Sequence, residues 1–320
     1  MSSECQYQIP TIDFSIHSLE VDRGTKEWYS LCKRVREACE NNGFFEIVYD
    51  KIPLQLRAET FSMMRQVFRL PLETKKKYCS PRPYGGYLGQ NPNLPLFESF
   101  GLEDPSNHES LRSFTQLMWP DGHDQFCNTV ISMVKKLDEL KHMIEVMILD
   151  SYGLGDKSKS IMASTTLLRI MKYSSPPLGQ YMQGLHAHTD KALSTILCDD
   201  QVSGLEIETK DGQWLKLSFS PNSLVFVVGD LLMLQAWSNG RMHAAKHRVM
   251  ISGEKERYSL GQFVDPVEGT IIKAPKELVD EEHPRILKDI DYTKFSKFFY
   301  SEEGRAVDTQ TQIFAFAGIH

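Results

Sequence analysis

The sequence predicts a mainly β core with helices packed around it. Eight short β-rich runs follow one another between residues 166 and 263, and turn signals such as Lys210-Asp211-Gly212 separate them. A long helical pattern precedes these runs, and further helical patterns stand near both ends of the chain. Short strands at this spacing are typical of two sheets packed face to face. We therefore expect a double-stranded β-helix (jelly roll, cupin-like).

The first third of the chain is expected to be mostly helical. Residues 25–43 place Trp28, Leu31 and Val35 at helical spacing, and Asn-Asn-Gly is a suitable stop. The apolar run 44–49 follows as a buried strand, and a second helix is predicted over 56–70. Residues 80–122 are rich in Pro, Gly and Asn, which indicates a long loop.

The strongest periodic signal covers residues 125–151, where apolar side chains recur every three or four positions. Such a stripe fits a helix that lies against a sheet. The β-rich runs that follow are 166–173, 194–198, 204–208, 214–217, 223–229, 231–237, 246–251 and 257–263. Helix returns from residue 291. We expect an N-terminal helical and loop region over 1–122, and the support helix, jelly-roll core and C-terminal helices over 123–320.

Composition excludes several partners and compartments. The net charge is −6 and the longest basic run is Lys75-Lys76-Lys77, so nucleic acid is not an expected partner. The start has no signal-peptide pattern, and the most apolar stretch, 224–237, is too short to span a bilayer. The 6 cysteines form no C-x-x-C pair, which indicates free thiols in a reducing compartment. A cytoplasmic monomer with no membrane contact is expected.

The stretch "LHAHTDKAL" raises the question of a metal site, because His186, His188 and Asp190 occupy alternate positions. A zinc hydrolase of the H-x-H-x-D type needs a further histidine after the aspartate, and the sequence has Lys191 there. His243 and His247 are spaced like the histidines of a zinc protease. That motif needs glutamate after the first histidine, where this chain has alanine. Both zinc interpretations are therefore disfavoured.

An iron site agrees better with the residues present. Two histidines and one carboxylate on one side of an iron ion leave positions free for a co-substrate and dioxygen. His188 and Asp190 supply two of these ligands. In the run "KHRVMI", alternation places His247, Val249 and Ile251 on one face, so His247 points inward and is the expected third ligand.

A buried arginine is expected beside this site. Arg257 and Ser259 share one strand face after "SGEKE", which we interpret as a hairpin turn between neighbouring strands. No acidic residue accompanies Arg257 on its own strand, and a buried unpaired charge is costly. A dicarboxylate that chelates iron at one end and contacts Arg257 at the other resolves this; a structural ion pair with a remote carboxylate is the alternative.

Together, His188-x-Asp190, His247 in "HRV" and Arg257-x-Ser259 resemble the signature of plant-type Fe(II)/2-oxoglutarate-dependent dioxygenases. The segments "IPTIDF", "NNGFFEI", "LPLETKKKY" and "GDLLMLQAWSNGR" also have counterparts in that family. The resemblance implies Fe(II) as cofactor, 2-oxoglutarate and O2 as co-substrates, and ascorbate as a supporting reductant. It also implies that Tyr173, with Arg257 and Ser259, binds 2-oxoglutarate. Met171 departs from the family, which often has asparagine there.

Within the family, "HTDK", "AWSNGRMHAAKHRV" and "ELVDEEHPRI" look most like the AOP/DAO branch. This implies oxidation of a small specialised metabolite or hormone by hydroxylation, desaturation or dealkylation. His186 and Phe263 are the candidate substrate contacts, His186 because strict alternation turns it toward the same cavity as His188. The alternatives are a non-catalytic metabolite-binding protein on the same scaffold and, less favoured, a zinc metallohydrolase.

Overall fold

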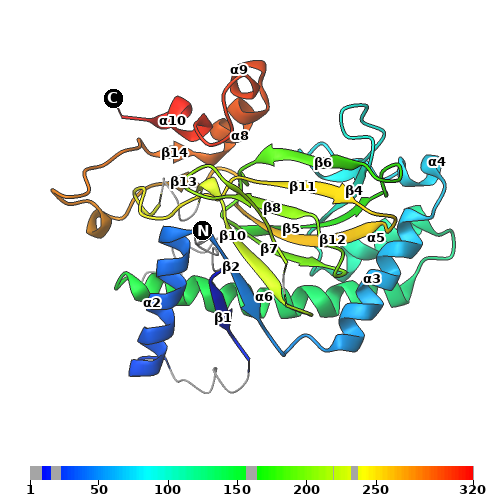
Figure 1. The fold of residues 1–320 in the computed structure, drawn as a ribbon, viewed down its shortest axis with the longest axis horizontal. Helices are drawn as coiled ribbons and strands as arrows, with labels where there is room; N and C mark the ends of the chain where they lie inside the picture. Colours follow the sequence, from blue (N-terminus) through cyan, green and yellow to red (C-terminus); the bar gives the residue numbers. More distant parts are fainter. Residues whose placement is uncertain (1–8, 16–22, 156–163, 219, 232–236, 320) are drawn as a thin grey trace, which may run out of the picture.

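The computed structural model describes residues 9–15, 23–155, 164–218, 220–231 and 237–319. Two β-sheets form its core, with helices arranged around them (Figure 1), which confirms the expected jelly roll with flanking helices. The strand expected at 231–237 falls largely on residues outside the described ones. None of the helices in the described ranges is long and apolar enough to cross a membrane.

The larger sheet has 8 strands. In spatial order they are Thr11–Asp13 (β1), Phe44–Val48 (β2), Leu224–Val228 (β10), Ser194–Asp199 (β7), Arg257–Pro266 (β12), Ser164–Tyr173 (β5), Phe97–Glu103 (β4) and Gly86–Leu88 (β3). The smaller sheet has 4 strands, in the order Tyr181–His188 (β6), His247–Ser252 (β11), Leu205–Glu208 (β8) and Trp214–Lys216 (β9). Ile271–Ile272 (β13) and Ile290–Asp291 (β14) pair separately.

The turn after β11 joins the two sheets, so the expected hairpin between β11 and β12 is wrong. β11 pairs with β6 and β8, whereas β12 pairs with β5 and β7. The physical reason is burial: Val249 and Ile251 of β11 form one apolar cluster with Met171 and Tyr173 of β5. The strand bearing Arg257 consequently belongs to the sheet opposite His247.

Three helices accompany the larger sheet: Lys26–Asn41 (α2), Leu54–Phe68 (α3) and Asp124–Ser151 (α6). In Figure 1, α6 runs along the lower side of the sheet, α2 lies at the left and α3 at the right. The α6 stripe that the sequence indicates is confirmed, because its apolar residues are all buried: Phe126, Val130, Met133, Leu137, Leu140, Ile144 and Ile148. Helix α2 begins where the Thr25 side chain accepts a hydrogen bond from the Trp28 backbone N–H. Both α2 and α3 contact α6.

Residues 80–122 contain regular structure, so the expectation of one long loop is wrong. They include β3, β4 and the helix His108–Met118 (α5), while Leu72–Lys75 (α4) lies just before them. The sequence pattern misleads because Pro and Gly cluster before β4, whereas β4 itself buries Phe97 and Phe100. Asn107 caps α5 by accepting hydrogen bonds from two backbone N–H groups.

The N-terminal third supplies strands β1 to β4 to the same sheet as β5, β7, β10 and β12. The division of the chain at residue 122 remains a prediction. The cysteines of the described ranges are free, as expected: Cys32, Cys39, Cys79, Cys127 and Cys198.

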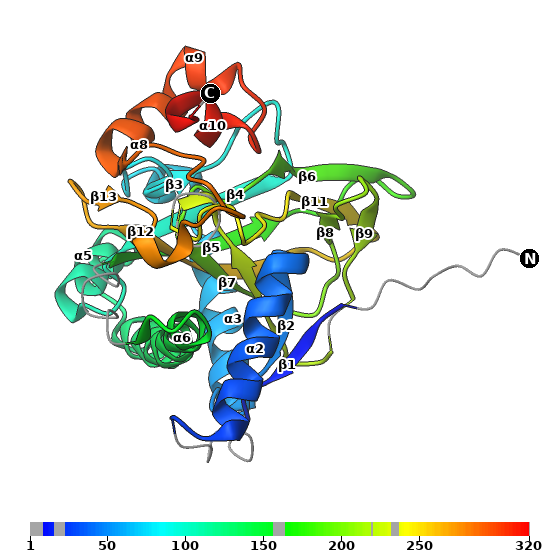
Figure 2. The ribbon, with the colours of Figure 1, turned by 90° about the vertical axis from the view of Figure 1, so that its left-hand side faces the viewer.

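The C-terminal segment forms Lys276–Leu278 (η3), Tyr292–Tyr300 (α8), Glu302–Arg305 (α9) and Gln312–Ala317 (α10). The helix expected from residue 291 is confirmed by α8. Figure 2 shows α8, α9 and α10 on the side of the sheets away from α6. Phe295 is fully buried and its ring packs against Phe316, whereas Tyr300 contacts Tyr84 of the loop before β3.

Candidate metal centre

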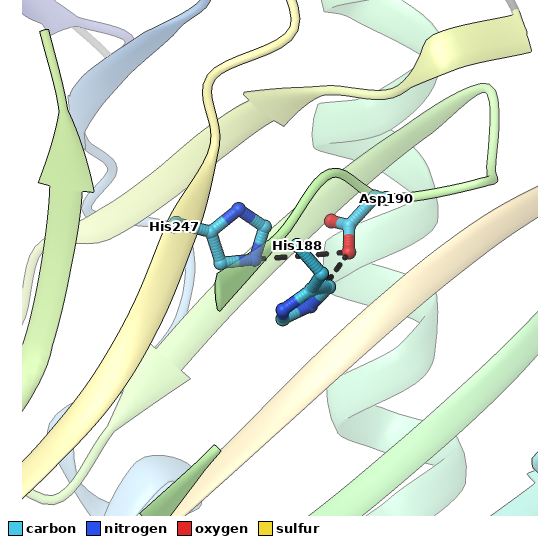
Figure 3. A group of neighbouring side chains, drawn as sticks. All are labelled: His188, Asp190 and His247. Atoms are coloured by element: carbon cyan, nitrogen blue, oxygen red, sulfur yellow. Dashed lines mark ion pairs between the residues drawn. The ribbon is translucent and has the colours of Figure 1, made fainter. Parts of the chain in front are cut away.

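The fold brings together the three residues that the sequence singles out as metal ligands. His188 ends β6 and pairs in register with His247, the first residue of β11 (Figure 3). Asp190 lies two residues beyond β6 rather than on it. The Nε2 atoms of His188 and His247 lie 3.5 and 3.7 Å from the same Asp190 oxygen, Oδ1. One potential ligand atom from each residue lies within 4.8 Å of the others.

Backbone contacts set the orientation of both imidazole rings. His188 Nδ1 lies 2.8 Å from the His186 carbonyl oxygen, and His247 Nδ1 lies 3.1 Å from the Ala245 carbonyl oxygen. A carbonyl oxygen only accepts hydrogen bonds, so each Nδ1 carries the proton and donates it. Each Nε2 is then left with its lone pair directed toward Asp190. This is the arrangement of a metal-binding histidine.

The Asp190 carboxylate is buried, and a neighbouring strand holds it in place. Thr195 of β7 donates a hydrogen bond of 2.6 Å to Asp190 Oδ2, which leaves Oδ1 facing the imidazoles. Burial alone would raise the pKa of Asp190. His247, His188 and the Thr195 hydroxyl outweigh that effect and hold the pKa well below its usual range. Asp190 is therefore ionised at neutral pH and offers an anionic oxygen to a metal ion.

His247 is suited to bind a cation for a related reason. Burial and the adjacent His188 lower its pKa to about 4, although the Asp190 carboxylate acts in the opposite direction. A histidine must be neutral to coordinate a metal. His247 is neutral at physiological pH and stays neutral on acidification until the pH approaches its lowered pKa. Two imidazoles and one carboxylate on one side of an ion fit Fe(II), with positions left open on the other side.

A β-bulge next to His188 changes the surroundings of His186. Val249 pairs with Leu185 and His247 pairs with His188, so the single residue between them on β11 opposes two residues on β6, His186 and Ala187. Strict alternation, on which the shared cavity of His186 and His188 was predicted, is interrupted here. His186 is exposed, and its Nδ1 lies 3.1 Å from Gln183 Oε1. A substrate contact by His186 remains a prediction.

Arg257 has an acidic partner on a neighbouring strand, so the ion pair with a remote carboxylate, given above as the alternative, is present. Its Nη2 lies 3.0 Å from Asp199 Oδ2, its Nη1 donates to Ser259 Oγ at 3.0 Å, and its Nε donates to the Val202 carbonyl at 2.9 Å. Asp199 comes from β7, the strand beside β12. Sequence inspection missed it because strand pairing, not sequence distance, places Asp199 within reach of Arg257.

Tyr173 lies beside Arg257, as its predicted role requires. The two residues pair in register across β5 and β12, and the guanidinium carbon lies 5.4 Å from the centre of the tyrosine ring. Tyr173 is fully buried. Burial raises the pKa of its hydroxyl, and Arg257 partly counteracts this. Met171, in the place of the family's asparagine, receives a weak hydrogen bond from Tyr173 through its sulfur at 3.7 Å.

Phe263 is half-buried and pairs in register with Thr195, which holds Asp190. Its ring lies over Gly261: a Cβ added at Gly261 would lie 2.7 Å from the ring. This places Phe263 close to the metal ligands, and its contact with substrate remains a prediction. Thr195 itself was missed from sequence. The only sequence signal for Thr195 is its position five residues after Asp190 in a β-rich run. This signal points to a contact with Asp190 only once the position of β7 in the sheet is known.

Comparison with known proteins agrees with this geometry. Residues 165–266 match the 2OG-Fe(II) oxygenase superfamily, and residues 9–121 match the non-haem dioxygenase in morphine synthesis N-terminal family. The chain is 40% identical to the Arabidopsis thaliana probable 2-oxoglutarate-dependent dioxygenase AOP1.2, over 97% of this chain and 96% of that protein.

Two solved structures share the fold over most of the chain. The 2-oxoglutarate complex of the dioxygenase for auxin oxidation 1 from Arabidopsis thaliana has a TM-score of 0.76 and 31% identity, covering 87% of this chain and 100% of that one. JOX2 in complex with 2OG, Fe and JA has a TM-score of 0.79 and 25% identity, covering 97% of this chain and 89% of that one. The chain therefore belongs to the 2OG-Fe(II) oxygenase superfamily and is a 2-oxoglutarate-dependent dioxygenase that uses Fe(II).

Proposed function

We propose that this dioxygenase oxidises a small specialised metabolite or hormone, with His188, Asp190 and His247 holding the iron. The observation that carries the proposal is that one ligand atom each of His188, Asp190 and His247 lies within 4.8 Å of the others (Figure 3). Bound iron would supply the oxidising power by activating dioxygen while 2-oxoglutarate is decarboxylated to succinate and CO2. The names of the relatives, one of which is a dioxygenase for auxin oxidation, support a hormone or metabolite as the substrate.

Arg257, Ser259 and Tyr173 are proposed to bind the distal carboxylate of 2-oxoglutarate. A guanidinium has five N–H donors, and the three contacts to Asp199, Ser259 and Val202 use three of them. The remaining two suffice for one carboxylate. The role of the protein is to orient the co-substrate, to keep Asp190 ionised, and to exclude water between the two sheets. We further propose that the enzyme is a cytoplasmic monomer.

The test is an untargeted metabolite screen. Purified enzyme is incubated with iron, ascorbate, 2-oxoglutarate and a plant metabolite extract, and both substrate loss and succinate formation are measured. Asp190→Ala is expected to lose iron binding and turnover together, because it removes the only anionic group of the ligand set. Undiminished turnover in that variant would overturn the ligand assignment.

A second variant tests the co-substrate site. Arg257→Ala is expected to raise the KM for 2-oxoglutarate by roughly tenfold or more, since hydrogen bonds to a charged group contribute about 1.5–3 kcal/mol. Its iron affinity should remain close to that of the wild type. An unchanged KM for 2-oxoglutarate would count against Arg257 as the docking residue.

A further inference from the structure

The segment that carries Asp190 lies outside the strands, so strand pairing does not fix it. β6 ends at His188, and Thr189 and Asp190 follow it without regular structure. The backbone N–H of Asp230 donates a hydrogen bond of 2.8 Å to the Asp190 carbonyl oxygen. The side chains on either side of Asp190, those of Thr189 and Lys191, make further contacts. Both of them reach residues far along the chain.

Lys191 binds three acceptors with its ammonium group. Nζ donates to Thr189 Oγ1 at 2.8 Å, to the Asp230 carboxylate, and to the Thr309 carbonyl oxygen near the C-terminus. An ammonium group has three N–H donors, so all of them are used. The Lys191 side chain is only 10% exposed. The Thr189 hydroxyl lies 3.1 Å from the same Thr309 carbonyl oxygen. One C-terminal carbonyl thus contacts the side chains on both sides of Asp190.

A second lysine links the same C-terminal segment to another metal ligand. Lys246 directly precedes His247, the first residue of β11, and its Nζ lies 3.2 Å from Asp308 Oδ2. Asp308 and Thr309 are consecutive in the chain. Together they contact the chain neighbours of Asp190 and of His247, two ligands that come from separate segments.

Asp308 and Thr309 belong to a hydrogen-bonded turn that leads into α10. The Asp308 carbonyl oxygen accepts hydrogen bonds from the backbone N–H groups of Thr311 and Gln312, at 2.9 and 3.1 Å. Helix α10 contacts α8, and α8 contacts α9. Figure 2 shows these three helices together at the C-terminal end of the chain. The turn therefore connects the segment around Asp190 to the C-terminal helices as a group.

Two explanations of these contacts make different predictions for iron binding. If the lysines only attach the C-terminal helices to the core, the affinity for iron does not depend on positioning by Lys191. The positive charge of Lys191 repels a metal cation, so its removal would then strengthen Fe(II) binding. If Lys191 positions Asp190, its removal weakens Fe(II) binding. The sign of the change distinguishes the two explanations.

We propose that Asp308 and Thr309 form a clamp on the metal centre, and that Lys191 is the positioning residue that connects this clamp to Asp190. The inference rests on the proposed function, because it assumes the iron ligands assigned there. It adds a coupling between two parts of the molecule: docking of the C-terminal segment favours the ligand positions that iron requires. Such a coupling is reciprocal, so bound iron should in turn stabilise the docked C-terminal segment.

Hydrogen exchange tests the coupling in the wild-type enzyme, without any variant. The intact protein is labelled in the absence of oxygen, with and without saturating Fe(II), and peptides that cover residues 306–318 are followed by mass spectrometry. Bound iron is expected to slow amide exchange in this segment by at least about fivefold, the lower end of typical coupling between two sites. Exchange in residues 306–318 that does not respond to Fe(II) would overturn the proposal.

The double variant Lys191→Met/Asp230→Asn assigns the effect to Lys191. It removes the contact with Thr309 and leaves neither partner as an unpaired buried charge, so it should remain folded, which circular dichroism verifies. Its net charge equals that of the wild type. Anaerobic titration should show a Kd for Fe(II) raised by at least about tenfold. At saturating Fe(II), the slowed exchange of residues 306–318 should be lost.

A matched control is Lys136→Met, which replaces a lysine that pairs with Glu139 on α6. Its Fe(II) affinity and its iron-dependent exchange should equal those of the wild type. Wild-type or tighter Fe(II) binding in the double variant would show that Lys191 only attaches the C-terminal helices, and would overturn the proposal.

Failure of the clamp and failure of the proposed function give different results. If Asp190→Ala keeps its iron and its turnover, the assigned ligand set is wrong. If Asp190→Ala loses iron while Lys191→Met/Asp230→Asn binds it as the wild type does, the ligand set stands and the clamp alone is refuted.

Discussion

Thr195 provides the sharpest test of how the metal centre is built. The Thr195→Val substitution replaces the hydroxyl with a methyl group of similar size, so the packing of β7 is kept. It removes the 2.6 Å hydrogen bond to Asp190 Oδ2. Both residues are buried, at 0% and 5% exposure, so water cannot readily take the place of the lost donor. The carboxylate then loses the contact that fixes its orientation.

The expected loss follows from this single contact. A hydrogen bond to a charged group contributes about 1.5–3 kcal/mol. Removing a group that orients a metal ligand typically weakens metal affinity by about 10- to 100-fold. Every 1.4 kcal/mol corresponds to about a factor of ten, so the two figures agree. We expect the Kd for Fe(II) to rise by about 10- to 100-fold in Thr195→Val.

The pH dependence of iron binding gives an independent measurement. The Thr195 hydroxyl is one of the groups that lower the pKa of Asp190, so its removal raises that pKa. Protons compete with the metal for Asp190. On acidification the variant should therefore lose iron at a higher pH than the wild type.

The assay is anaerobic Fe(II) titration at several pH values, with Thr195→Ser as the matched control because serine keeps the hydroxyl. The serine variant should stay close to the wild type. Circular dichroism verifies that both variants are folded. A Kd in Thr195→Val within about twofold of the wild type, with no change in its pH dependence, would refute the role given to this hydroxyl.

Three further substitutions test the packing and electrostatics around the site. In Gly184→Ala, the new Cβ would lie 2.7 Å from the buried Tyr173 ring, so a thermal melt should show that the protein is destabilised by about 1–3 kcal/mol. Titration with 2-oxoglutarate should also show a weaker affinity, because Tyr173 is displaced. Lys191→Met leaves buried Asp230 without its cation and should lower stability to denaturant by about 3–5 kcal/mol; an unchanged midpoint would show that the pair is dispensable. Burial lowers the pKa of His243 to about 4. Below pH 6.5 the unfolded chain binds a proton that the buried imidazole does not bind, so the stability present above pH 6.5 is lost as the pH falls toward 4. His243→Gln should flatten this part of the stability profile, and parallel profiles would contradict it.

Local patterns were enough to predict much of the fold and the metal ligands. The stripe on α6 predicts a buried helix face because its period is a property of the helix itself. Likewise, alternation along β11 predicts that His247 points inward with Val249 and Ile251, as their burial confirms. These predictions depend only on residues adjacent in sequence, and such residues keep their relative directions in any fold that retains the element.

Only the tertiary structure decided which residues meet across neighbouring strands. Nothing in the sequence shows that β11 and β12 lie in opposite sheets, that Asp199 reaches Arg257, or that a bulge interrupts the alternation at His186. Arg257 is not an unpaired buried charge, because Asp199 of the neighbouring strand forms an ion pair with it. Hydrogen-bond partners of buried charges come from strand neighbours far along the chain, and only folding determines which strands become neighbours.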